Sequence, residues 1–231
     1  MKDPRYQQLA RSLIRYSTGL KAGEKVLIEA IEIPDEMVCA LIEEARAVGG
    51  IPLVTLKSQR VHRALVKAGD AEMMQACAEF ELHRMERVQA YIALRGAANA
   101  TEYADIPADR MKHYTSHWWK PVHIETRVPK TRWVVLRWPH PSMAQAAGKS
   151  TEAFEDFYFQ VCNLDYGRMS KAMDPLVKRM SAADQVHITG PDTDLTFSIK
   201  DIPVVKCAGT MNVPDGEVFT APVRDSVNGV I

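Results

Sequence analysis

The first part of the chain alternates short apolar runs with segments in which apolar residues recur every three or four positions. The short apolar runs predict a buried strand at Lys25–Ile31 and further strands at Ile51–Leu56, Ala90–Leu94 and Trp133–Trp138. The three-to-four-residue spacing predicts helices at Tyr6–Ser17, Met37–Val48, Val61–Lys67, Asp70–Arg87 and Pro107–Trp119. Strands that alternate with helices indicate an α/β fold with a mostly parallel sheet covered by helices on both faces.

Two prolines are expected to interrupt helices, because proline lacks the backbone N–H and disfavours helical geometry in the residue before it. Pro121 should end the helix that begins at Pro107. A long helical region is predicted from Ser150, a good N-cap residue, to about Met180, and Pro175 should break it.

After Asp184 the pattern changes to short β segments separated by turn residues. These segments are Val186–Thr189, Leu195–Ile199, Val204–Val205 and Glu217–Ala221. We therefore predict a domain boundary near residue 182. Residues 1–182 would form an α/β domain with a long helical connection. Residues 183–231 would form the β-rich start of a second, α+β domain. This second domain is expected to be incomplete, because its few strands have no visible second layer to bury them.

Composition and charge exclude several classes of function. The chain has 231 residues, of which 46% are hydrophobic and 25% charged, as in ordinary globular proteins. Lys plus Arg equals Asp plus Glu at 29 each, so no overall field favours nucleic acid or an anionic membrane. No apolar run approaches the roughly 20 residues that cross a bilayer. We expect neither nucleic-acid nor membrane partners, and function must come from a local site.

The cysteines point to a reducing compartment. Cys39, Cys77, Cys162 and Cys207 are far apart, and no CxxC pair occurs. The N-terminus mixes charged and apolar residues from the start and lacks the uncharged core of a signal peptide. We predict a cytoplasmic protein.

Three histidines raise the question of a metal site. His113 and His117 are four residues apart on a predicted helix, with His123 nearby, and two imidazoles on one helical face are a known zinc arrangement. The segment HYTSH lacks the Glu that follows the first His in the HExxH motif. An amphipathic packing surface is the better interpretation.

Other polar residues have simple structural explanations. His140 follows a strand and lies between two prolines, where a role in stabilising a turn is favoured over ligand binding. Asp192 and Asp194 lack the later Gly and Glu of a calcium loop and are better explained by turn chemistry. Ser142 has no GxSxG motif around it.

Glu217 lies between a turn and a short strand. Asp215-Gly216 is a strong turn signal, and in the following strand Glu217 shares a face with Phe219 and Ala221. A carboxylate on such a face lies at an exposed edge or has a partner for its charge. Its local pattern alone favours a solvated Glu over a metal ligand.

The last third of the chain resembles the M29 metalloaminopeptidases, the thermophilic aminopeptidase T-like family. The resemblance lies in four blocks, RWPHPSMAQAAGKS, FEDFYFQVCNLDYGRM, GPDTDLTFSI and NVPDGEVFTAPVRDSVNG, and their order and spacing agree with the family. A looser similarity extends to GLKAGEKVLIEA and to Gly49–Pro52. The resemblance therefore covers the whole chain, in the N-terminal portion of the family sequence.

The resemblance implies a function and a site. Members are hydrolases that remove single residues from the N-terminus of peptides, and they use two divalent metal ions, zinc or cobalt. It implies that Glu217, in the GEVFTAP motif, binds one of the metals, that the other ligands lie beyond Ile231, and that the protein is a homodimer with short peptides as substrates. The α/β domain would partly enclose the active site.

Two alternatives stay open. The chain could be a truncated, non-catalytic homologue that acts as a binding or assembly module, as its end in an apolar segment at Val230–Ile231 suggests. It could also be an unrelated ligand-binding α/β domain, if the agreement in GEVFTAP were chance.

Overall fold

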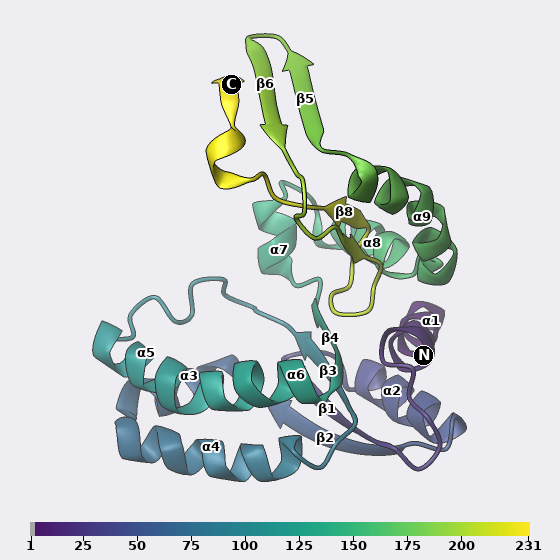
Figure 1. Cartoon of the computed structure of the whole chain (residues 1–231). Coiled ribbons are helices and arrows are strands. Elements are labelled where there is room, and N and C mark those ends of the chain that lie inside the picture. Colours follow the sequence, from purple (N-terminus) through teal and green to yellow (C-terminus); the bar gives the residue numbers. More distant parts are fainter. Residues whose placement is uncertain (1–2) are drawn as a thin grey trace. The chain divides into compact units, whose positions relative to one another are not determined.

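The chain folds into two compact units in a computed structural model that describes residues 3–231 (Figure 1). The N-terminal unit extends to Leu164 and also includes Gly209–Pro214, and the C-terminal unit comprises Asp165–Ala208 and Asp215–Ile231. The chain thus leaves the N-terminal unit after Leu164 and returns to it at Gly209. The predicted domain boundary near residue 182 coincides with the end of a helix within the C-terminal unit, and it stays a prediction.

The N-terminal unit is built on a four-stranded, all-parallel sheet. Its strands are β1 (Lys25–Ile31), β2 (Ile51–Lys57), β3 (Ala90–Arg95) and β4 (Arg132–Arg137), in the order β2-β1-β3-β4. Each strand lies within one residue of the predicted run. The parallel α/β fold predicted from the sequence is therefore confirmed.

Helices lie on both faces of this sheet (Figure 1). Their bounds are α1 (Pro4–Arg11), which continues as the π-helix η1 (Ser12–Ser17), α2 (Asp35–Ala47), α3 (Gln59–Ala68), α4 (Ala71–Met85), α5 (Ala108–Tyr114), the π-helix η2 (Thr115–Arg127), α6 (Val128–Lys130), α7 (Pro141–Ala146) and α8 (Thr151–Cys162). Several begin at side-chain caps: the carboxylates of Asp3 and Asp70 and the hydroxyl of Ser150 accept hydrogen bonds from the first turns of α1, α4 and α8.

The two faces of the sheet have different chemistry. One face carries the fully buried apolar side chains of Val26 and Ile28 of β1. The other, which we call the inner face, carries Leu27 and Tyr91 against α4 and η2, and the buried Trp118 of η2 belongs to the same core cluster. The inner face also carries the buried carboxylate of Glu29 in the middle of β1.

Both predictions about proline were wrong. Helical structure continues from α5 through Pro121 to Arg127 because residues 115–127 form a π-helix, whose wider turn leaves room for the proline ring. Pro175 lies inside α9 (Tyr166–Ala182). The predicted long helical region is interrupted instead at residues 163–165, where Asp165 caps the start of α9 through the backbone N–H of Arg168.

The segment Gly209–Pro214 adds to the free side of β4. The backbone N–H of Val135 donates to the carbonyl of Met211 at 2.9 Å, and the N–H of Val213 donates to the carbonyl of Val135 at 3.2 Å. Asn212 thereby forms a parallel bridge with Val135. Residues far along the chain thus close the β4 edge of the sheet.

The C-terminal unit combines helix α9 with two small antiparallel sheets. One sheet has the order β5-β6-β9, formed by Gln185–Gly190, Thr193–Ser198 and Asn228–Val230, and the other pairs β7 (Val205–Cys207) with β8 (Glu217–Phe219). A short 3-10 helix, η3 (Arg224–Ser226), precedes β9. The β-rich character predicted for this region is confirmed, with β8 ending two residues before the predicted Ala221.

Candidate functional site

Glu217 begins strand β8, directly after the turn that the sequence predicts. Gly216 has a φ of +145°, a conformation that glycine adopts without strain. The ladder with β7 places Glu217 opposite Cys207 and Phe219 opposite Val205. The Glu217 side chain is exposed and, within residues 3–231, makes no hydrogen bond or ion pair. The structure therefore leaves this carboxylate free to bind a ligand.

The neighbours of Glu217 form a small acidic environment. Burial raises the pKa of the Cys207 thiol, and the charges of Asp215 and Glu217 raise it further. The backbone N–H of Asp215 donates to the Tyr166 hydroxyl at 3.3 Å, which ties the turn to helix α9. On the other side of the ladder, the Lys206 ammonium holds Asp174 of the same helix at 2.6 Å. Helix α9 thus holds both the turn before Glu217 and the neighbouring strand β7.

No metal-binding cluster is complete in the part of the chain that the structure describes. No three His, Cys, Asp or Glu side chains among residues 3–231 are grouped so that they could hold a metal ion. Glu217 fits a metal by its chemistry, since an unpaired carboxylate is a common ligand, but it supplies one donor only.

The histidines predicted to pack do so. The rings of His113 and His117 stack with their centroids 5.9 Å apart. His123 is buried, 5.9 Å from the Tyr91 ring, and belongs to the packing of η2 against the sheet. Desolvation lowers the pKa of His123 to about 4, so this imidazole is neutral at physiological pH. No third donor joins the pair His113–His117 in the described residues.

The remaining polar candidates have structural contacts: His140 and Asp192 have the turn roles predicted for them, whereas Asp194 lies in strand β6 and not in the turn. The ring of His140 makes a hydrogen bond through Nε2 with the carbonyl of Glu32 at 3.0 Å and lies at the start of α7. Asp192, with φ at +55°, forms the tight turn between β5 and β6, and Asp194 pairs with His187 at 2.9 Å. The Ser142 hydroxyl donates to the carbonyl of Ala97.

The sequence analysis missed a buried charge network on the inner face. The Lys57 ammonium lies 2.8 Å from Glu29 and 2.8 Å from Glu81. The Tyr91 hydroxyl donates to Glu29 at 3.1 Å, and the Trp118 indole donates to Glu81 at 3.0 Å. Burial raises the pKa of Glu29, and the charge of Lys57 more than offsets this, so that its pKa lies below the ordinary value. The signal in the sequence was a single Glu inside the apolar run KVLIEAI.

Arg127 lies at the end of η2 on the same face. Its guanidinium is stacked between two rings, with its central carbon 4.2 Å from the centre of Trp133 and 5.3 Å from that of Tyr91. The residue is only 6% exposed, and its Nε and Nη1 atoms have no hydrogen-bond acceptor. Desolvation lowers the pKa of Arg127 below its ordinary value.

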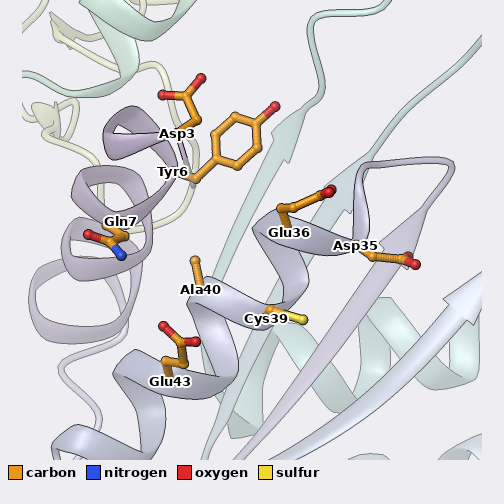
Figure 2. Close-up of a pocket in the computed structure, with 8 residues that line it drawn as sticks. All are labelled: Asp3, Tyr6, Gln7, Asp35, Glu36, Cys39, Ala40 and Glu43. Atoms are coloured by element: carbon orange, nitrogen blue, oxygen red, sulfur yellow. The ribbon is translucent and has the colours of Figure 1, made fainter. Parts of the chain in front are cut away.

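A cavity of about 350 Å³ lies between α1 and α2. Figure 2 shows Tyr6 and Gln7 from α1 opposite Cys39 and Glu43 from α2. Its lining also includes the carboxylates of residues 3, 35 and 36 and the methyl group of residue 40. The carboxylate of Asp3 is bound by Arg5, so part of this acidity is neutralised within α1.

The sequence itself places the chain in a class of enzymes. Residues 2–231 match the family described as thermophilic metalloprotease (M29). The chain therefore belongs to this family of metallopeptidases, and the resemblance noted from its motifs is confirmed.

Solved structures support the fold. Wild-type AmpT from Thermus thermophilus is similar with a TM-score of 0.75 and 22% identity over 99% of this chain and 64% of that one. The 2,5-dihydroxypyridine dioxygenase from Pseudomonas putida KT2440 is similar with a TM-score of 0.52 and 14% identity over 97% of this chain and 57% of that one. No curated protein sequence matches the chain. The chain spans less than two thirds of the length of either protein.

Proposed function

We propose that the protein is a metal-dependent aminopeptidase that removes N-terminal residues from short peptides. The observation that carries the proposal is the match of residues 2–231 to the thermophilic metalloprotease (M29) family. The chain spans 64% of the length of AmpT, and we therefore assign it part of the active site.

Glu217 is the residue that we assign to the metal centre. Its carboxylate is exposed, has no polar partner in the described residues, and follows a turn anchored to α9 by the Tyr166 hydroxyl. A ligand held by a short strand loses little conformational freedom on binding a metal. The β7–β8 ladder thus positions one donor of the proposed site.

Two divalent ions, zinc or cobalt, complete the proposed site. Such a pair supplies a water of lowered pKa as the nucleophile and stabilises the oxyanion that forms on the scissile carbonyl. Glu217 contributes negative charge and a fixed oxygen donor on one side of that pair. Its open position on β8 leaves the carboxylate accessible from solvent.

The partners follow from the same proposal. Peptides are the substrates, and a homodimer is the expected assembly. Among the residues described, no helix is both long and apolar enough to span a bilayer. The four cysteines form no disulfide, which supports a cytoplasmic location.

Hydrolysis of leucine p-nitroanilide by the protein as isolated from its natural cells tests the proposal. We expect release of nitroaniline only with added Co²⁺ or Zn²⁺, and a loss of at least 100-fold in kcat for Glu217→Gln, because the amide supplies no negative charge to the metal. Asp225→Asn, which removes an exposed carboxylate from η3, is the matched control and should keep full activity.

Metal content separates the possible outcomes. Wild-type protein should bind Co²⁺ and Glu217→Gln should bind it more weakly. Unchanged activity and cobalt content in Glu217→Gln would refute the assignment of this ligand. A natural protein that ends at Ile231 and shows no metal-dependent hydrolysis would favour the alternative, a non-catalytic binding module.

A further inference from the structure

Two arginines lie side by side at the carboxyl edge of the parallel sheet. Arg95 is the last residue of β3 and Arg137 the last residue of β4, and the two are direct register partners. Register partners on neighbouring strands lie roughly 4.8 Å apart and point to the same face. Because side chains alternate, Arg95 follows Tyr91 and Ala93 onto the inner face, and Arg137 follows Trp133 onto the same face.

This edge is where α/β sheets bind ligands. The strand order β2-β1-β3-β4 reverses direction at β1, because β2 lies on one side of it and β3 on the other. Ligands of open α/β sheets bind outside the carboxyl ends of the strands at such a point. Arg95, at the end of β3, belongs to this position.

No carboxylate neutralises the two arginines. Neither side chain makes a hydrogen bond or an ion pair in the described part of the chain. The nearby acids are committed elsewhere: Glu29 binds Lys57 and Tyr91, and Glu32 accepts a hydrogen bond from the backbone N–H of Gln59. The carboxyl edge between β3 and β4 therefore has an excess of positive charge.

Arg127 has unsatisfied donors on the same face of the sheet, where it contacts the rings of Tyr91 and Trp133 near the beginnings of β3 and β4. It is nine-tenths buried, two of its guanidinium nitrogens have no acceptor, and the charge of Arg95 acts on it strongly enough to lower its pKa further. The buried Nδ1 of His123, four residues earlier, is also without a partner. Buried polar groups in native proteins are nearly always satisfied, so these donors are available to an acceptor from outside the chain.

We propose that Arg95 and Arg137 bind a carboxylate. Guanidinium groups bind carboxylates through two parallel hydrogen bonds, and a pair of them on one sheet face offers a planar fork for a single anion. Resting on the proposed aminopeptidase function, the inference identifies this anion as the C-terminal carboxylate of a short peptide. The site would select peptides with a free C-terminus.

Binding of two matched peptides to the full chain without metal tests the inference. The probes are Leu-Gly-Gly with a free carboxylate and the same peptide as its C-terminal amide, titrated while tryptophan fluorescence is followed, since Trp133 stacks on Arg127. We expect the acid to bind at least tenfold more tightly than the amide. Arg95→Gln and Arg137→Gln should each abolish this difference, and Arg11→Gln, an exposed arginine of α1, should keep it. Circular dichroism of each variant confirms that it is folded.

Three results would overturn the inference. The first is equal binding of the acid and the amide, and the second is an equal loss of the preference for the acid in Arg11→Gln and Arg137→Gln. The third is saturation of the two arginines by inorganic phosphate with no binding of the free peptide. The last would identify a phosphate site in place of a peptide site. The test requires no catalysis. If the proposed aminopeptidase function is wrong, hydrolysis will be absent while the preference for the free-acid peptide is kept. If the inference is wrong, hydrolysis will be intact while that preference is absent.

Discussion

Replacing Lys57 by methionine should severely destabilise the N-terminal unit. Lys57 is the only cation bonded to Glu29 in the described residues, and Glu29 is 7% exposed. Methionine fills the volume of the lysine stem but supplies no charge. Glu29 would keep one hydrogen bond, from the Tyr91 hydroxyl.

The magnitude follows from the burial of the pair. Removing one partner of a buried ion pair costs about 3–5 kcal/mol, because the other charge stays desolvated and uncompensated. Glu81, the second carboxylate that Lys57 binds, has 25% of its side chain exposed, so the loss of its ion pair adds less to the destabilisation. We expect Lys57→Met to lose about 3–5 kcal/mol of unfolding free energy at pH 7, a large share of the stability of a typical domain.

Urea unfolding followed by tryptophan fluorescence measures this loss. All four tryptophans, Trp118, Trp119, Trp133 and Trp138, lie in the N-terminal unit, so the signal reports that unit. Lys67→Met is the matched control, since the Lys67 ammonium pairs with Asp105 at 2.8 Å on the surface. Exposed pairs contribute at most about 1 kcal/mol, which sets the expected loss in the control.

The pH dependence provides a second check. In the wild type the pKa of Glu29 is depressed, so its contribution to stability is present above the pKa of an unfolded Glu and is lost as pH falls through the folded value. Without Lys57, burial raises that pKa instead, and protonation relieves the penalty at lower pH. The difference between wild type and Lys57→Met should therefore shrink from pH 7.5 to pH 5.

A loss below about 1 kcal/mol in Lys57→Met at pH 7, equal to that in Lys67→Met, would refute this reasoning. The double variant Glu29→Gln/Lys57→Met adds a further constraint. It removes both charges, and we expect it to recover most of the stability, since position 29 then carries no buried charge and its side-chain oxygen still accepts the hydrogen bond from the Tyr91 hydroxyl.

Three further predictions concern single positions. The wild type should lose roughly 3 kcal/mol of unfolding free energy as pH falls from about 6.5 to 4, because the folded pKa of His123, about 4, lies below that of an unfolded histidine. His123→Phe should remove this loss. Urea unfolding of both proteins at pH 7 and pH 4.5 measures it, and the wild type would show no such loss if the imidazole were protonated in the fold. Gly96→Ala should cost about 1–3 kcal/mol, because an added Cβ would lie 2.4 Å from the carbonyl oxygen of Glu32, and an unchanged urea midpoint would contradict this. Glu217→Ala should change the free energy of unfolding by no more than about 0.5 kcal/mol in a thermal denaturation experiment, since its side chain is exposed and unpaired. A larger loss would indicate a structural role.

The parallel sheet could be predicted because its signal is local. Each strand is a short run of apolar residues, and such runs between helical segments indicate the strands of a parallel sheet. How far each strand is buried depends on its place in the sheet, since the edge strand β2 has Leu56 65% exposed. The helices around Pro121 and Pro175 could not, because their continuation depends on tertiary context. The π-helical turns accommodate Pro121, and the Lys206 ammonium from β7 donates to the carbonyl of Ser170 and binds Asp174, beside Pro175.

The candidate sites also divide into features with a signal in the local sequence and features that depend on tertiary structure. Motifs singled out Glu217 through a family resemblance, whereas its local pattern favoured a solvated side chain. The juxtaposition of Arg95 and Arg137 depends on the register of two strands that a long helical crossover connects, and no periodicity in the sequence carries that register. The network around Glu29 was hidden for the same reason, since its partners Lys57 and Glu81 come from other elements.

The return of Gly209–Pro214 to strand β4 affects how the protein is made. During synthesis, β4 leaves the ribosome long before Asn212. The hydrogen-bonding groups of Val135 therefore lack their partners until the intervening helices α7, α8 and α9 and strands β5, β6 and β7 have been translated. An unpaired strand edge can pair with another chain, which makes this interval the period of greatest aggregation risk for the nascent protein. A chain cut at residue 182 would keep that edge open permanently.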